Sequence, residues 1–186
     1  MARYKHTAML LMLGWGVAAC SGQDEAAERA KAEEEQQLLA AKEKAVQTYL
    51  GAGKVIGPKL EAFRDVLLEV QSACRENCDI PSHKKAFEEK VLPSYDAVLR
   101  ALDTMPTETD QLGAIHAKLL DAYRKSGQML VDYPKGLDVQ NKDARLVAYI
   151  QDLSVSIRDV EEAYKKELRE YCSEAPKVDC TLSSKK

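Results

Sequence analysis

The chain has 186 residues, of which 27 are Lys or Arg and 30 are Asp or Glu, so its formal net charge is −3. A hydrophobic share of 45% is too high for a disordered chain, and the length suits one domain with a buried core. The charge balance excludes a nucleic-acid-binding protein, because that class needs a basic excess to displace counterions from phosphates.

The first nineteen residues have the layout of an export signal. Arg3 and Lys5 precede an uncharged, largely apolar run from Thr7 to Ala19. This run is too short to cross a bilayer core of about 30 Å as a helix, whereas it suits the apolar region of a signal peptide. We therefore expect residues 1–19 to be a signal peptide that is absent from the mature chain.

Small residues and a cysteine close this signal, in the order Val17-Ala18-Ala19-Cys20. The segment resembles the lipobox of bacterial lipoproteins, in which a small residue precedes the cysteine that receives lipid. The resemblance implies cleavage before Cys20, acylation of that cysteine, and attachment to a membrane through the acyl chains. In the sorting system of enteric-type Gram-negative bacteria, Asp after the lipidated cysteine retains such proteins at the inner membrane, so Ser21 implies the outer membrane. We expect the periplasmic face of that membrane, and the cell surface is the alternative. The alternatives are an ordinary secretory signal or a short membrane anchor.

A charged segment follows the lipidation site. Residues 20–37 are rich in Ala, Glu, Lys and Gln, which are good helix formers, but they offer little to bury beyond alanine. We expect a lipidated Cys20 and a solvated helical spacer between lipid and body. A coiled coil would need large apolar residues in heptad positions, and this segment has none.

Residues 38–175 carry the pattern of a helical bundle. The first helix has an apolar face with steps of three or four residues, which persists across Gly57-Pro58. We expect one long helix, extended at its N-terminal end and bent at Gly57-Pro58; two separate helices are the alternative. This apolar face consists of Val46, Tyr49, Ala52, Ile56, Leu60, Phe63, Leu67, Val70 and Cys74.

Three further amphipathic segments complete the pattern. The residues expected at their starts are Ser82 for the second helix, Thr107 or Thr109 for the third, and Asn141 or Asp143 for the fourth. Pro93 should bend the second helix, and Tyr133-Pro134-Lys135-Gly136 should end the third. Four helices and three connections predict an all-α, antiparallel four-helix bundle, followed by a C-terminal tail at 176–186.

The cysteines fit an oxidising compartment. If Cys20 carries lipid, the even set of Cys74, Cys78, Cys172 and Cys180 remains, which in an exported chain favours disulfides. In the antiparallel bundle, Cys74 and Cys172 end helices at opposite poles, so we predict the local pairs Cys74–Cys78 and Cys172–Cys180. The first pair requires the helix to end between its cysteines. A fourth helix parallel to the third would permit long-range pairs instead.

Candidate ligands for a metal or cofactor are sparse. Cys74, Cys78 and His83 form a three-residue set that could bind zinc or copper, but a fourth ligand is missing and oxidation would consume both thiols. His116 lies beside an apolar face, where a neighbouring methionine could share a haem, yet no haem-attachment motif is present. We therefore expect neither metal nor cofactor.

Sequence signatures of catalysis are also missing. The chain has no nucleophile elbow, P-loop or dinucleotide fingerprint, and the glycine-rich Gly51-Ala52-Gly53-Lys54 lacks the preceding strand of a phosphate loop. The prediction is a non-enzymatic binding or structural module of the cell envelope with a protein partner and no catalytic residue. The alternative is a lipoprotein that handles a ligand or metal through a bundle cavity or the Cys74/Cys78/His83 set.

Overall fold

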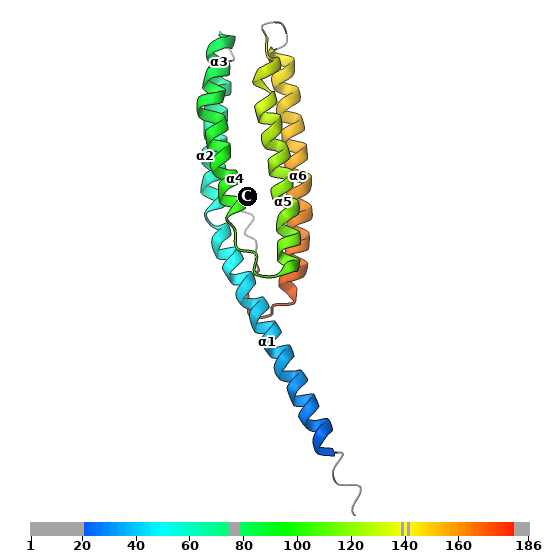
Figure 1. The fold of residues 1–186 in the computed structure, drawn as a ribbon. Helices are drawn as coiled ribbons and strands as arrows, with labels where there is room; N and C mark the ends of the chain where they lie inside the picture. The colour runs from blue at the N-terminus through cyan, green and yellow to red at the C-terminus, as the bar shows by residue number, and fades with distance from the viewer. Residues whose placement is uncertain (1–20, 75–78, 139, 141, 181–186) are drawn as a thin grey trace, which may run out of the picture. The chain divides into compact units, whose positions relative to one another are not determined.

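The computed structural model describes residues 21–74, 79–138, 140 and 142–180, and all regular secondary structure in this part of the chain is helical (Figure 1). The elements are α1 (Ser21–Gly53), α2 (Ile56–Ala73), α3 (Ile80–Ala86), the π-helical turn η1 (Phe87–Val91), α4 (Leu92–Asp103), α5 (Asp110–Asp132), the 3-10 turn η2 (Pro134–Gly136) and α6 (Lys142–Ser173). The predicted all-α class is confirmed. The expectations for residues 1–19 and Cys20 lie outside the described residues.

The chain divides into two compact units, residues 1–40 and 41–186. In the first unit, α1 exposes every side chain from Glu25 to Leu38, and the ion pair between Arg29 and Glu25 is itself exposed. A helix that is polar all round gains nothing from burial and depends on the helix propensity of its residues. Within the described residues, no helix combines the length and apolarity needed to span a membrane.

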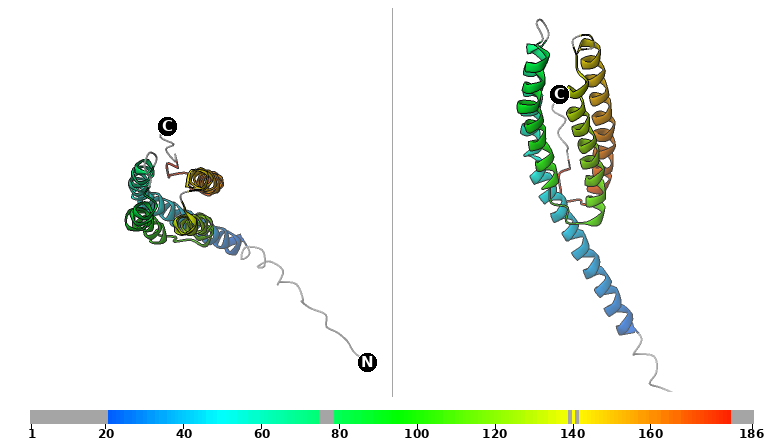
Figure 2. Two further views of the ribbon diagram at one scale, coloured as in Figure 1. Left: turned by 90° about the horizontal axis from the view of Figure 1, so that it is seen from above. Right: turned by 45° about the horizontal axis from the view of Figure 1, so that its top comes forward.

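The second unit is an antiparallel four-helix bundle, as predicted. Its first arm consists of α1 from Ala41 onward together with α2, its second of α3, η1 and α4, and its third and fourth of α5 and α6. Figures 1 and 2 show α5 and α6 side by side in opposite directions, and α2 packs along α4. The fourth helix therefore returns antiparallel to the third.

Two adjoining clusters of buried side chains form the bundle core. One joins α2, the second arm and α5 around Phe87, Val91 and Val98. The other joins α1, the start of α5 and the end of α6 around Val46 and Leu112. These five side chains are fully buried, and burying a residue of this kind contributes about 1.5–3 kcal/mol.

The first arm breaks earlier than predicted. α1 ends at Gly53 and α2 begins at Ile56, so Gly57-Pro58 lies in the first turn of α2 instead of at the bend. The amides of Lys54 and Val55 bond three residues back, to the carbonyls of Gly51 and Ala52. Because Pro58 lacks an N–H, it is best tolerated near a helix start, and this moves the interruption upstream.

The second arm corrects the predicted N-cap and shows how the helix holds Pro93; the bend predicted there stays a prediction. Its N-cap is Asp79, whose carboxylate accepts a hydrogen bond from the amide of Ser82, so Ser82 itself lies in the first turn. The helix accommodates Pro93 by widening into the π-helical turn, where the amide of Leu92 bonds to the carbonyl of Phe87. The widened turn compensates for the backbone hydrogen bond that is lost because proline has no N–H.

The third and fourth arms begin close to the predicted residues. Thr109 caps α5 by accepting a hydrogen bond from the amide of Leu112, which selects Thr109 over Thr107. The helix ends at Asp132, and η2 follows at the predicted Pro134–Gly136 stop. α6 starts at Lys142, between the two residues proposed for its start.

A disulfide closes the C-terminal end of the bundle. Cys172 and Cys180 are bonded, with their Cα atoms 5.9 Å apart, as predicted. Cys74 is also disulfide-bonded, but Cys78 lies outside the described residues, so the Cys74–Cys78 pair stays a prediction. The Cys172–Cys180 bond excludes the long-range pairs that a parallel fourth helix would have allowed.

The loop within this disulfide is fixed to α1. Ala175 is buried in the second core cluster, and the backbone amide of Lys177 donates to the Glu43 carboxylate at 3.3 Å. Lys42 forms an ion pair with Glu174 and lies over the Tyr171 ring, 4.2 Å from its centroid. The tail therefore holds the first arm where α1 enters the bundle.

Candidate functional site

Two of the three candidate metal ligands line one pocket. Cys74 and His83 contribute to a hollow of about 250 Å³ between the end of α2 and the start of the second arm. Cys78 lies outside the described residues. The remaining lining residues are Glu69, Val70, Ala73, Asp79, Ser82, Ala86 and Lys90.

The chemistry of this pocket does not favour a metal. The Cys74 sulfur is in a disulfide and is not a free thiolate. Burial lowers the pKa of His83, while a backbone hydrogen bond with Val70 opposes that shift, and Nε2 lies 3.3 Å from the Tyr133 hydroxyl. Among the described residues, no group of three or more His, Cys, Asp and Glu side chains is placed to hold a metal ion.

The charged groups of the pocket already interact with each other or with the backbone. Lys90 forms an ion pair with Glu69 at 2.8 Å, which links the second arm to α2. The Asp79 carboxylate is bound to Ser82 as the helix cap. A ligand here would have to displace these interactions.

An aromatic cluster forms the inner wall beside His83. Tyr133 packs against Phe87 and Tyr149, with ring centroids 4.9 and 4.7 Å apart, and His83 meets Tyr133 edge-on at 6.1 Å. Aromatic pairs at such separations stabilise cores beyond the area they bury. The cluster therefore packs α6 and the C-cap residue of α5 against the second arm.

The second histidine lies in a buried chain of hydrogen bonds. His116 Nε2 is 2.9 Å from the Leu102 carbonyl oxygen, and Nδ1 is 2.9 Å from the Tyr49 hydroxyl, which is 2.8 Å from the Tyr164 hydroxyl. Because a carbonyl only accepts, Nε2 must carry a hydrogen. In the neutral ring, Nδ1 then accepts from Tyr49, whose oxygen in turn accepts from Tyr164.

These hydrogen bonds occupy both ring nitrogens of His116. Neither nitrogen is therefore available to bind a haem iron opposite a methionine such as Met105 or Met129. Burial lowers the pKa of His116, and the Leu102 carbonyl and the Asp103 charge oppose that shift only in part. Burial likewise raises the pKa of Tyr49. The network therefore joins α1, α4, α5 and α6 in its neutral form.

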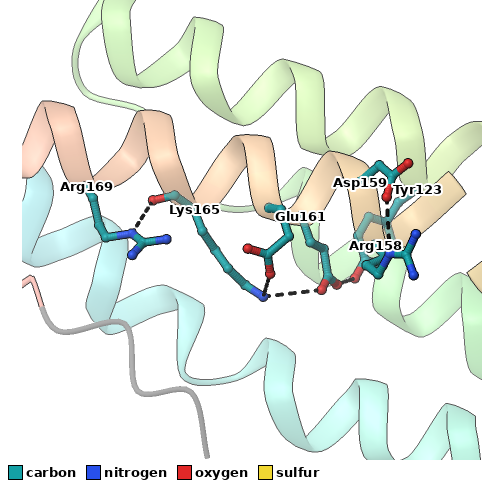
Figure 3. A network of polar contacts seen from close by, with 7 residues as sticks. Tyr123, Arg158, Asp159, Glu161, Lys165 and Arg169 are labelled. Atoms are coloured by element: carbon teal, nitrogen blue, oxygen red, sulfur yellow. Dashed lines mark hydrogen bonds and ion pairs between the residues drawn. The ribbon is translucent and has the colours of Figure 1, made fainter. Parts of the chain in front are cut away.

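A third polar group lies on α6 (Figure 3). The Tyr123 hydroxyl donates to Glu161 at 2.6 Å, and Lys165 lies 3.7 Å from the same carboxylate. Arg169 donates to the Lys165 carbonyl at 3.0 Å. Burial, followed by the Glu161 charge, raises the pKa of Tyr123, so this tyrosine stays protonated and fixes α5 to α6.

The sequence did not reveal these polar networks. In the sequence, Tyr49, Tyr123 and Tyr164 are only tyrosines on or beside apolar faces, a position typical of rings that are buried while the hydroxyl stays hydrogen-bonded. Their partners are far away in sequence: 67 residues separate Tyr49 from His116, and 115 separate it from Tyr164. Only the register between arms brings them together.

Together, the fold and these sites define a disulfide-braced helical bundle whose interior polar groups serve packing. Comparisons of the chain with protein-family models, with curated proteins and with solved structures found no match.

Proposed function

We propose that the chain is a lipid-anchored, non-enzymatic binding or structural module of the bacterial cell envelope. Cys20 would carry the lipid, residues 20–37 would form the spacer, and the bundle would bind or position a protein partner at the periplasmic face of the outer membrane. The observation that carries the proposal is the fully exposed helix from Glu25 to Leu38 between the lipobox-like segment and a packed body. At 1.5 Å per residue, it would separate bundle and lipid by roughly 20 Å.

The buried chemistry supports binding over catalysis. His83, His116 and Tyr123 are buried or largely buried, and their polar atoms bond to other groups of the bundle. General acid–base catalysis needs a group that can reach a substrate at a suitable pKa. The oxidised Cys74 likewise disfavours the metal-handling alternative, because a thiolate is the form that binds metal.

Lipidation is the decisive test of this proposal. Cells expressing the full chain would be labelled with a palmitate analogue and fractionated, with Cys20→Ser as the test variant and Cys172→Ser as its control. We expect label and membrane association in the natural chain and the control, and loss of both in Cys20→Ser. Unlabelled natural chain, or equal labelling of Cys20→Ser, would overturn the proposal. Separation of inner and outer membranes then locates the protein.

A further inference from the structure

A groove lies where α1 gives way to α2, beside the last two turns of α4. It holds about 520 Å³, a size within the usual range of ligand sites. Most of its lining side chains are apolar and small or flexible, and Val55 among them is 57% exposed. The lining residues are Ala52, Val55, Lys59, Ala97, Arg100, Ala101, Thr104 and Met105.

The charge of this groove is opposite to that of the chain. Lys59 from α2 and Arg100 from α4 are its charged lining residues, and no carboxylate from the described part of the chain lines it, although acidic residues outnumber basic ones in the whole chain. Arg100 forms one exposed ion pair with Asp96 at 2.7 Å, which leaves other guanidinium N–H groups for a further acceptor. Among the described residues, Lys59 has no ion-pair partner. The first turn of α2 has no acidic residue either.

Gly51 precedes the lining residue Ala52 in the sequence and has open space beside it. It lies in the last turn of α1. A Cβ added there would meet nothing within 4 Å, and the backbone does not have the positive φ that favours glycine. Glycine inside a helix costs about 1 kcal/mol relative to alanine. Close approach of another chain would account for a glycine here.

We propose that this groove docks an acidic helical segment of a partner protein. A small or apolar side chain of the segment would cover the alanines that line the groove. The carboxylates of the segment would meet Lys59 and Arg100, and its backbone would pass next to Gly51. One cation from α2 and one from α4, together with the apolar lining side chains, suit a helix that carries carboxylates and an apolar side chain on one face. This inference rests on the proposed function as a binding module and names the partner's chemistry.

Fluorescence anisotropy tests the inference with the purified full chain in detergent. The probe is a labelled helical peptide of glutamate, alanine and leucine, and the same peptide with lysine in place of glutamate is its control. We expect saturable binding of the glutamate peptide, weakened about tenfold or more by the double change Lys59→Glu and Arg100→Glu. The matched control reverses two exposed cations elsewhere, Lys85→Glu with Lys125→Glu, and should leave the affinity unchanged.

The glycine supplies a second, independent measurement. Gly51→Ala and Gly51→Leu should keep or raise the melting temperature, because the added side chain enters open space in a helix, while each progressively weakens peptide binding. Gly113→Ala in α5, where a Cβ would lie 3.9 Å from Thr107, is the control and should leave binding unchanged. If Gly51→Leu binds the peptide as well as the natural chain does, the docking geometry is wrong.

Other occupants of the groove give distinct results. The docking proposal fails if no saturable peptide binding is found or if the Lys59/Arg100 variant binds equally well. It also fails if those cations are needed instead for adsorption to vesicles of anionic lipid, or for formation of a dimer seen by light scattering. Peptide binding is measured apart from the labelling of Cys20, so this inference and the proposed function can fail separately.

Discussion

The two parts of α1 are helical for different reasons. From Glu25 to Leu38 every side chain is exposed, whereas farther along the same helix Ala45, Val46 and Tyr49 are almost completely buried. The first part depends on the helix propensity of Ala, Glu, Lys and Gln, and the second also on burial against α5 and α6. One part of α1 is therefore helical without contributing to the core, and the other part also packs into it. Substitutions should change stability little in the exposed part and strongly in the buried part.

The largest expected effect comes from a charge in the buried part. Val46→Asp places a carboxylate without a partner in the second core cluster, and we expect a loss of about 3–5 kcal/mol in the free energy of unfolding. Ala30→Asp adds the same group to the exposed part and should change stability by less than about 0.5 kcal/mol. Urea unfolding followed by tyrosine fluorescence measures both. Similar losses of unfolding free energy for the two variants would contradict the division of α1 into an exposed and a buried part.

The C-terminal disulfide provides the next test. The double variant Cys172→Ser with Cys180→Ser frees the loop that holds the first arm through Glu43, and opening a loop of this length should cost about 2–3 kcal/mol. The same unfolding measurement gives the loss. In hydrogen exchange, protection should fall around Val46 and stay unchanged before Leu38. Unchanged protection around Val46 would show that the loop does not hold α1.

Acid should destabilise the bundle and not the exposed helix. The pKa values of His83 and His116 are lowered mainly by burial, so below about pH 6.5 the unfolded chain binds protons that the folded chain does not. Stability is therefore complete above that pH and is lost as the pH falls below it, by at most about 1.4 kcal/mol per pH unit for each histidine.

Urea midpoints measured between about pH 8 and pH 5 test this sign. His116→Gln should lower stability at neutral pH and reduce its dependence on pH, since one of the two titrating groups is gone. Midpoints that rise as the pH falls would show that the histidines bind protons more strongly in the fold than in the unfolded chain.

The sequence predicted the bundle because local signals agreed with the apolar faces. Thr109 and Pro134 mark both ends of the third helix, and the faces of all four segments fall into one antiparallel arrangement. The sites were less predictable. A proline can bend a helix, widen it or start it, and the choice at Pro58 and Pro93 depends on packing. The hydrogen-bond partners of His116 depend on the register between the four arms, and a single sequence does not determine that register.

The smallest effect concerns two glycines of one helix. A Cβ on Gly127 of α5 would lie 3.0 Å from a ring carbon of Tyr95, whereas on Gly113 it would meet Thr107 at an ordinary 3.9 Å. The Tyr95 ring stacks on Tyr123 and its hydroxyl donates to the Tyr123 carbonyl, so it has little room to move.

Alanine should therefore have opposite effects at these two positions. Overpacking costs about 1–3 kcal/mol and the gain in helix propensity returns about 1 kcal/mol, so Gly127→Ala should lose about 1 kcal/mol overall. Gly113→Ala should be neutral or slightly stabilising, as a change in the exposed part of α1 would be. The melting temperatures of the two variants, measured by thermal unfolding, test this prediction. A stabilised Gly127→Ala would mean that propensity outweighs packing even at the contact between α4 and α5.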